Sequence, residues 1–184
     1  EKAQKELDAI ETSDLLISRL TKELKAAEAA AREKAAALTA ARREAAARFS
    51  RDVMAQLEFL DMPGVSLEVA VEAVPLGNGG ADRVEFLIAA NPGEPAKPIA
   101  RIASGGELSR IMLAIKSVLA DADDIDTLIF DEIDTGISGR AARKVGIKLR
   151  ETAASRQVLC VTHLAQIASL AHHHLLIAKT VREG

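Results

Sequence analysis

The first 62 residues of the chain contain neither glycine nor proline. From Glu1 to Met62 the sequence is dominated by Ala, Glu, Lys, Arg and Leu, which are good helix formers. This segment is therefore predicted to form one long helix or two. A single helix of that length would extend about 90 Å, beyond the edge of a small domain. The expected organisation is a helical arm over residues 1–62 and a second domain over residues 63–184.

Apolar residues recur along this arm with the 3.5-residue spacing of a coiled coil. Asp14, Thr21, Glu28 and Arg42 fall on the same track and make the seam imperfect. The spacing favours a coiled-coil arm that needs a partner helix, and the alternative is a long solvated helix on the surface of a larger body. The apolar members of the track are Leu7, Ile10, Ile17, Leu24, Ala31, Ala35, Leu38, Ala45 and Phe49.

The second domain begins where Pro63 and Gly64 end the helical pattern. Alternating residues in "VSLEVAVEAV" and "RVEFLIAAN" predict an antiparallel hairpin with one buried face, joined by the turn "PLGNGGAD" and followed by the loop "NPGEPAKP". On that face we expect Val65, Leu67, Val69 and Val71 from the first strand and Val84, Phe86 and Ile88 from the second.

Helices and apolar strands alternate through the rest of the chain. Such alternation is typical of an α/β fold with a buried, largely parallel sheet. The expected elements are a helix over 106–120, a strand over 127–130, a helix over 139–154, a strand over 157–161, a helix over 164–170 and a strand over 175–179.

Charge and composition limit the partners and the cellular compartment expected for this chain. A net charge of −3 gives no overall attraction to nucleic acid, so any such contact must come from a local basic patch. The single cysteine, Cys160, fits a reducing compartment and is expected to be buried and inert. The sequence has no apolar run long enough to span a membrane and does not begin like a signal peptide. We expect a cytoplasmic protein without membrane contact.

Two carboxylates follow the apolar strand in "DTLIFDEIDTG". Open α/β sheets place their ligands at the carboxyl ends of their strands, which is where Asp131 and Glu132 lie. Asp131 is suited to hold Mg²⁺ through water, and Glu132 is suited to polarise an attacking water. The alternative is that both carboxylates merely stabilise the following turn.

The next strand, in "QVLCVTHLAQIA", ends in Thr162 and His163. A histidine beside two carboxylates can donate a hydrogen bond to a terminal phosphate and hold the attacking water. The alternative is a structural histidine at the start of a helix.

Two adjacent glycines precede the helix in "ASGGELSR". Ser104 and Glu107 have the spacing of a capping box, which explains those two residues but not Gly105 and Gly106. Residues without a Cβ let another molecule approach the amide groups at the positive end of a helix, which favours an anion such as phosphate. We therefore expect substitution of these glycines to obstruct a ligand while barely affecting the local fold.

The order "SGGELSR", "LIFDE", "DTGISG" and "VTH" resembles the C-terminal half of ABC-type ATPase heads of the SMC class. The similarity runs from about Pro63 onward and is strongest to bacterial members of that class that act in DNA recombination and repair. It implies that Ser104, Gly105, Gly106 and Glu107 form the signature motif. Asp131 and Glu132 are then the Walker B pair, and His163 is the switch histidine. The D-loop runs from Asp134 to Gly139, with Ser138 in place of the aspartate common in other D-loops.

The resemblance also implies what lies outside this sequence. A G-x-x-x-x-G-K-[ST] phosphate loop is absent, and in such proteins an N-terminal head lobe supplies it through an antiparallel coiled coil. We expect the chain to be truncated at both ends and inactive alone. In the complete protein, ATP and Mg²⁺ would lie between two heads of a homodimer that acts on DNA at the nucleoid.

Two other functions remain open at this point. One is a coiled-coil scaffold whose head has lost hydrolysis, although the expected catalytic residues are present. The other is a different SMC-class ATPase, such as one that condenses chromosomes.

The run His172 to His174 makes a poor metal site, because consecutive side chains point in different directions. On the helix over 139–154, Ala142, Val145 and Leu149 form the core face, and the opposite face is either solvated or a DNA contact through Arg140, Arg143, Lys144 and Arg150.

Overall fold

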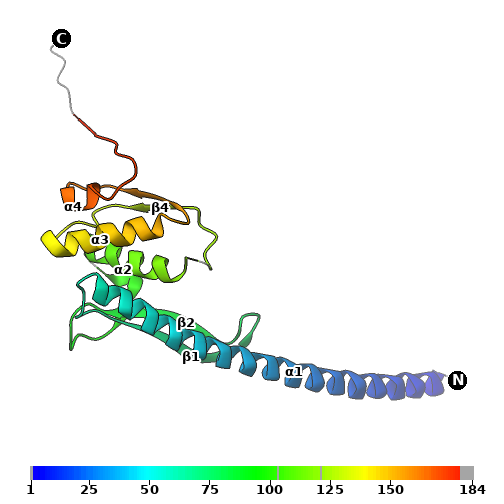
Figure 1. Ribbon diagram of the computed structural model, residues 1–184. Coiled ribbons are helices and arrows are strands. Elements are labelled where there is room, and N and C mark those ends of the chain that lie inside the picture. Colours follow the sequence, from blue (N-terminus) through cyan, green and yellow to red (C-terminus); the bar gives the residue numbers. More distant parts are fainter. Residues whose placement is uncertain (1, 103, 121, 179–184) are drawn as a thin grey trace, which may run out of the picture. The chain divides into compact units, whose positions relative to one another are not determined.

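The structure is a computed structural model that describes residues 2–102, 104–120 and 122–178, with side chains from residue 13 onward. Figure 1 shows its helices and strands along the chain. They are α1 (Lys2–Phe59), β1 (Ser66–Gly77), β2 (Gly80–Ala89), β3 (Lys97–Pro98), the 3₁₀ turn η1 (Ile99–Arg101), α2 (Gly105–Val118), β4 (Thr127–Phe130), α3 (Gly139–Thr152), β5 (Gln157–Cys160) and α4 (Ala165–Ala168).

The chain divides into two compact units. The first comprises Glu1–Ala46 and Ala70–Val84, and the second comprises Ala47–Val69 and Glu85–Gly184. The division that we predict at residue 62 follows composition rather than contacts, and it stays a prediction. None of the helices in the described ranges has both the length and the apolar composition needed to cross a membrane.

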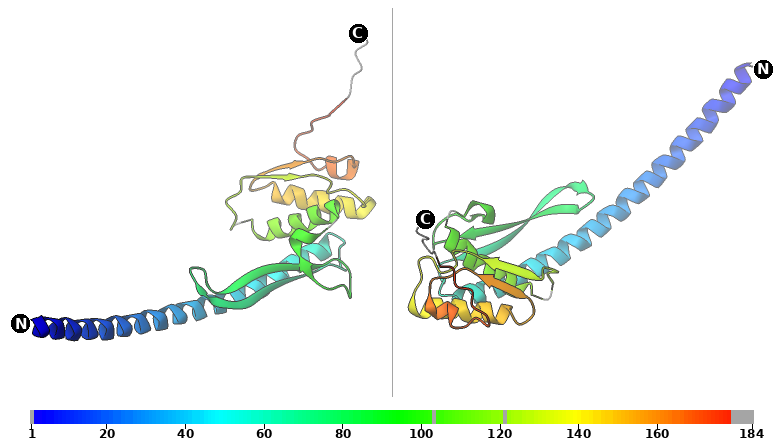
Figure 2. Two further views of the ribbon diagram at one scale, coloured as in Figure 1. Left: turned by 180° about the vertical axis from the view of Figure 1, so that it is seen from behind. Right: turned by 90° about the horizontal axis from the view of Figure 1, so that it is seen from above.

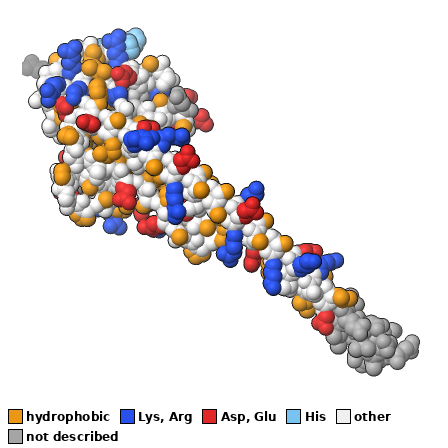
Figure 3. Space-filling view, turned by 60° about the horizontal axis from the view of Figure 1, so that its bottom comes forward, with side chains coloured by type: hydrophobic (Ala, Val, Ile, Leu, Met, Phe, Trp, Pro, Cys, Tyr) orange, Lys and Arg blue, Asp and Glu red, His pale blue; other side chains and the backbone are white. Residues whose placement is uncertain are grey.

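The long helical segment is confirmed as one helix, α1. In the first unit its exposed apolar side chains include Leu15, Ile17, Leu20 and Leu24, and Figure 3 shows basic and acidic side chains interspersed along its coloured part. Ala35, which lies on the same heptad track, is only 5% exposed.

The β1–β2 hairpin packs beside α1 in the first unit, as the views in Figure 2 show. Asp82 of β2 accepts a hydrogen bond from the Thr39 hydroxyl and forms an ion pair of 2.5 Å with Arg42. Arg42 also donates to the Gly79 carbonyl at 2.9 Å. Arg42, which interrupts the heptad pattern, is therefore used to hold the hairpin. Gly80, with φ of +106°, brings the strand start within contact distance of Leu38.

The hairpin differs from its prediction in two respects. β1 continues through Pro75 to Gly77, so the turn is only Asn78 and Gly79, the dipeptide that a two-residue hairpin favours. The expected buried face extends only part of the way, because Val84 and Phe86 are each 40% exposed. The loop after β2 also contains β3, which pairs antiparallel with β2.

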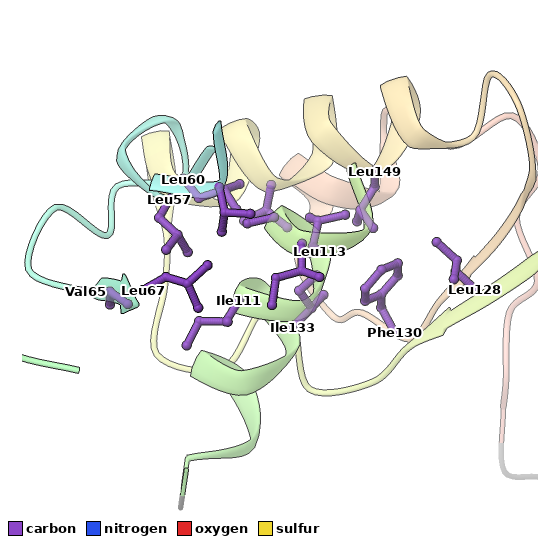
Figure 4. Packing of buried hydrophobic residues seen from close by; sticks show 14 of the residues in the cluster. Leu57, Leu60, Val65, Leu67, Ile111, Leu113, Leu128, Phe130, Ile133 and Leu149 are labelled. Carbon is purple, nitrogen blue, oxygen red and sulfur yellow. The ribbon is translucent and has the colours of Figure 1, made fainter. Parts of the chain in front are cut away.

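The second unit contains the apolar core, which Figure 4 shows. Leu113 of α2, Phe130 of β4 and Ile133 beyond β4 lie close together there, and each is at most 5% exposed. The end of α1 and the base of the hairpin complete this core. Its other fully or nearly buried members include Val53, Leu57, Leu60, Val65, Leu67, Ile88, Ile111, Leu128, Ala142, Val145 and Leu149.

β4 and β5 form a parallel pair, with Thr127 opposite Gln157 and Phe130 opposite Cys160. The prediction that these strands are fully buried is wrong. Leu128 and Phe130 face α2 and α3, whereas Ile129 is 70% and Leu159 44% exposed, because no described segment covers the other face. The last predicted strand is also wrong for residues 175–178, which form none, and Lys179 lies outside the described residues.

The core face that we predict for α3 is confirmed, since Ala142, Val145 and Leu149 are buried. The basic residues of α3 differ in whether they form ion pairs. Lys144 forms an ion pair of 2.6 Å with Asp61, and Arg140 lies 3.6 Å from the same carboxylate. The hydrogen bond from Lys144 holds the pKa of Asp61 below its usual value.

Candidate functional site

The carboxyl ends of β4 and β5 lie side by side, which places the predicted site residues together. The Val161 N–H donates to the Phe130 carbonyl at 2.9 Å, directly before the Asp131–Glu132 pair. Two residues later on the neighbouring strand comes His163. Because parallel strands end at the same edge of a sheet, the three polar side chains open onto one edge.

Glu132 adopts a left-handed backbone conformation, with φ of +56°. This conformation costs a non-glycine residue about 1–2 kcal/mol, and such costs concentrate at functional sites. Asp131 supports the turn, because its Oδ1 accepts the Glu132 N–H at 2.8 Å and its carbonyl accepts the Ser109 hydroxyl at 2.8 Å. Asp131 Oδ1 therefore stabilises the turn, as predicted by the alternative in which these carboxylates have only a structural role. Asp131 and Glu132 are nevertheless both exposed.

The start of α2 lies next to this turn. Ser104 is the N-cap residue, and its hydroxyl accepts the Glu107 N–H at 3.4 Å, so the serine half of the predicted capping box is present. The Glu132 carboxylate lies against Gly105, where a Cβ would overlap Oε2. The signature segment and the carboxylate pair are therefore neighbours within the chain.

The expectation that these glycines barely affect the local fold is wrong for Gly106. This residue is buried, and a Cβ there would lie 2.9 Å from Thr135 Cβ and 3.0 Å from the Glu132 and Thr135 carbonyl oxygens. Such distances are too short for a methyl group. Gly106 thus allows α2 to pack directly against the backbone of the turn that follows β4.

Arg110 of α2 supports the turn after β4 and was not among the residues predicted from the sequence. Its side chain is buried, and Nη1 donates to the Ile133 carbonyl at 3.2 Å and the Thr135 carbonyl at 2.9 Å. Burial lowers its pKa, although arginine keeps its charge in proteins. A signal was available, because Arg110 precedes the buried Leu113 and Ala114 by three and four residues, which places it on the buried face of the helix.

Asp134, predicted to contact nucleotide as part of the D-loop, is 4% exposed and faces the end of β5. Its Oδ2 accepts the Thr162 hydroxyl at 2.6 Å and the His163 N–H at 2.9 Å, and it lies 3.1 Å from His163 Nδ1. Burial raises the pKa of Asp134, but these hydrogen bonds outweigh it and hold the pKa below its ordinary value. The His163 side chain itself is 78% exposed.

The remaining predicted D-loop residues lie at the start of α3. Ser138 is the N-cap residue but makes no side-chain hydrogen bond to the helix, and Gly139 adopts φ of +54°. Both are exposed. The structure brings the two glycines before α2, Asp131, Glu132, Asp134 and His163 into one region, whereas Ser138 and Gly139 are exposed at the start of α3.

The donor set fits a magnesium ion that keeps most of its water. Asp131 Oδ2 and the Glu132 carboxylate are exposed oxygens, and Mg²⁺ in proteins is commonly bound by one or two carboxylates together with water and phosphate. A cage of three or more His, Cys, Asp or Glu residues is not present within the described ranges. The oxygens at this edge therefore suit a hydrated ion rather than an all-protein site.

Comparison with known proteins gives consistent results. DNA repair protein RecN of Halalkalibacterium halodurans is 40% identical over 181 residues, which is 96% of this chain and 32% of that protein. RecN of Bacillus subtilis is 38% identical over 199 residues, covering 100% of this chain and 34% of that protein. RecN of Treponema pallidum is 57% identical over 103 residues, which is 56% of this chain and 18% of that protein. No protein-family model matches.

Among solved structures, the Smc head domain with a coiled coil and joint from Pyrococcus yayanosii is similar, with a TM-score of 0.50 and 22% identity over 67% of this chain and 23% of that one. The fold is therefore that of an SMC-class head lobe carrying a long helix. The chain itself belongs to the RecN family of DNA repair proteins. It spans about a third of the length of the curated relatives that it matches.

Proposed function

We propose that this chain is the C-terminal part of an ATP-hydrolysing head that acts in the recombinational repair of DNA double-strand breaks. The observation that carries the proposal is the parallel pairing of β4 with β5, which brings Asp131, Glu132 and His163 to one edge. Family membership supports the repair role and weighs against a different SMC-class function.

Each side chain at this edge has a role in the proposed reaction. Glu132 accepts a proton from the attacking water, and exposed His163 orients the terminal phosphate. Asp131 holds Mg²⁺ through water. When bound, that ion neutralises charge on the phosphates. The signature residues Ser104, Gly105, Gly106 and Glu107 face nucleotide held by a second head, with their amides at the positive end of α2. Ser138 and Gly139 line the same interface.

The exposed apolar surfaces of this chain are proposed to bind other parts of the complete protein. An N-terminal lobe with the Walker A loop is proposed to cover the open face of β4 and β5, where Ile129, Leu159 and Val161 are 44–70% exposed. α1 is proposed to be the returning helix of an antiparallel coiled coil, and an outgoing helix from the N-terminal part of the complete protein is proposed to pack against its exposed side chains from Leu15 to Leu24. In this arrangement the chain alone neither binds ATP tightly nor hydrolyses it, and the active form is a homodimer.

DNA contact is proposed for the exposed basic residues of α3. Arg143 and Arg150 are exposed, and neither takes part in an ion pair found among the described residues. Lys144, by contrast, is half-buried against Asp61, so its charge is partly neutralised. The proposed location is the cytoplasm, in association with the nucleoid.

Substitution of Glu132 in the complete protein tests the catalytic assignment. Glu132→Gln keeps the shape of the side chain but removes the base, so ATP hydrolysis should fall by about 10²–10⁴-fold while ATP binding is retained. The measurements are steady-state phosphate release and equilibrium binding of a labelled nucleotide, with this chain alone as the blank.

Glu58→Gln is the matched control, because Glu58 is an exposed glutamate on α1 in the same unit. It should leave both measurements unchanged. If Glu132→Gln hydrolyses ATP as fast as the unaltered protein, the base is another residue and the proposed site is wrong.

A further inference from the structure

The buried carboxylate of Asp134 is directed toward the histidine of the site. Among the described residues, Thr162 and His163 supply the hydrogen-bond and ion-pair partners of its Oδ2 that lie outside the aspartate itself, at distances of 2.6, 2.9 and 3.1 Å. Within the described ranges Asp134 forms no ion pair with lysine or arginine. The groups that stabilise its negative charge therefore come almost wholly from the segment that carries the histidine.

The backbone that carries this carboxylate is also held in place. The carbonyls of the residues on either side of it, Ile133 and Thr135, both accept hydrogen bonds from buried Arg110 of α2. The Thr135 N–H in turn donates to the Glu132 carbonyl at 3.0 Å. A side chain on a backbone held at these points has little freedom to follow a moving histidine, so it can define the position of the ring.

The contact also favours one position for the ring proton. Nδ1 lies 3.1 Å from Oδ2, and an unprotonated Nδ1 would direct its lone pair toward an ionised carboxylate, which only accepts hydrogen bonds. A proton on Nδ1 avoids that repulsion. The other nitrogen, Nε2, is then directed away from Asp134, on a side chain that is 78% exposed. In neutral imidazole only one nitrogen is protonated, so the Nδ1–H form presents Nε2 as an acceptor.

We propose that Asp134 is a positioning residue that holds His163 in the Nδ1–H form, with Nε2 directed to the open side of the site. The inference rests on the proposed function for its catalytic meaning, but not for its geometry. It changes the expected chemistry, because neutral His163 would accept a hydrogen bond from water or a protonated phosphate through Nε2. Only the imidazolium would donate to the phosphate. Asp134 thus acts through His163 rather than by touching nucleotide.

The tautomer can be measured directly on this chain. Two-bond ¹H–¹⁵N spectra of the ¹⁵N-labelled chain distinguish the two neutral forms of each histidine, and His163→Gln assigns the signal. His172, His173 and His174 are exposed and serve as internal references. We expect the Nδ1–H pattern for His163 and the Nε2–H pattern, which free histidine prefers in water, for the other three.

Asp134→Asn is the informative variant, because it keeps size and shape while removing the charge. Its His163 signal should move toward the pattern of the reference histidines. Thr162→Val is the matched control, since it removes one donor to Asp134 but leaves the carboxylate beside the ring, and it should retain the Nδ1–H pattern. A His163 signal in the unaltered chain that matches the references would overturn the proposal, even if Asp134→Asn fails to fold.

Kinetics of the complete protein separate positioning from a purely structural role. Asp134→Asn should lower kcat by about 10–100-fold, as loss of a supporting carboxylate does at other sites, with little change in KM for ATP. An unchanged kcat would contradict a catalytic consequence of the contact. If instead the chain shows the Nδ1–H pattern but the complete protein hydrolyses no ATP, the geometry stands and the proposed function fails.

Discussion

Gly106→Ala is the substitution for which the structure makes the sharpest prediction. A methyl group at this position would meet three atoms at 2.9–3.0 Å, and two of them are backbone carbonyl oxygens of the turn after β4. That turn cannot easily retreat, because Arg110 binds the Ile133 and Thr135 carbonyls. The added carbon must therefore move α2 or the turn.

The size of the effect follows from two opposing contributions. Forcing an extra carbon into a packed interior costs about 1–3 kcal/mol. Replacing glycine by alanine within a helix raises the free energy of unfolding by about 0.5–1 kcal/mol. The free energy of unfolding should therefore fall by about 1 kcal/mol, and by no more than about 2.5 kcal/mol. For a chain of this length a loss of about 1 kcal/mol corresponds to a decrease in Tm of roughly 2–4 °C.

Gly105→Ala is the matched control, one residue away on the same helix. The only side chain near its Cβ is the exposed end of Glu132, which can rotate into solvent. Its stability should be unchanged or raised by up to about 1 kcal/mol, for the same gain in helix propensity. Differential scanning calorimetry of both variants gives the comparison. If Gly106→Ala is as stable as Gly105→Ala, the close packing of α2 on the turn does not constrain this position.

Two further predictions concern other parts of the chain. Asp82→Asn should accelerate amide hydrogen exchange in the β1–β2 hairpin by about tenfold, because it removes the charge that pairs with Arg42. The Thr39 hydroxyl and Arg42 hold the pKa of Asp82 below 3.8, so protection in the unaltered chain should persist at neutral pH and be lost only as the pH falls below that value; equal exchange in both chains would refute it. Burial raises the pKa of Cys160 to about 11. Its reaction with a disulfide reagent should therefore increase about a hundredfold from pH 8 to 10, against about tenfold for a thiol with pKa 9, and the smaller increase would exclude the shift.

Local sequence patterns determined the elements that carry the site. The lack of glycine and proline before Pro63 predicted α1, and short apolar runs predicted β4 and β5. The positions of Asp131, Glu132 and His163 followed from the ends of those strands. Such predictions succeed because helix propensity, strand hydrophobicity and the parallel arrangement of strand ends depend on neighbouring residues or on a general rule of sheets.

Other features depended on contacts between distant segments, which no local pattern encodes. Arg42 interrupts a heptad in the sequence, but in the fold it pairs with Asp82, forty residues later. Gly106 and Arg110 have ordinary helical positions until α2 packs against the turn after β4. Asp134 belongs to a loop motif, yet its carboxylate is buried against Thr162 and His163 because β4 and β5 end side by side. The sequence thus determined which residues reach the edge of the sheet, and only tertiary packing decided which of them face each other.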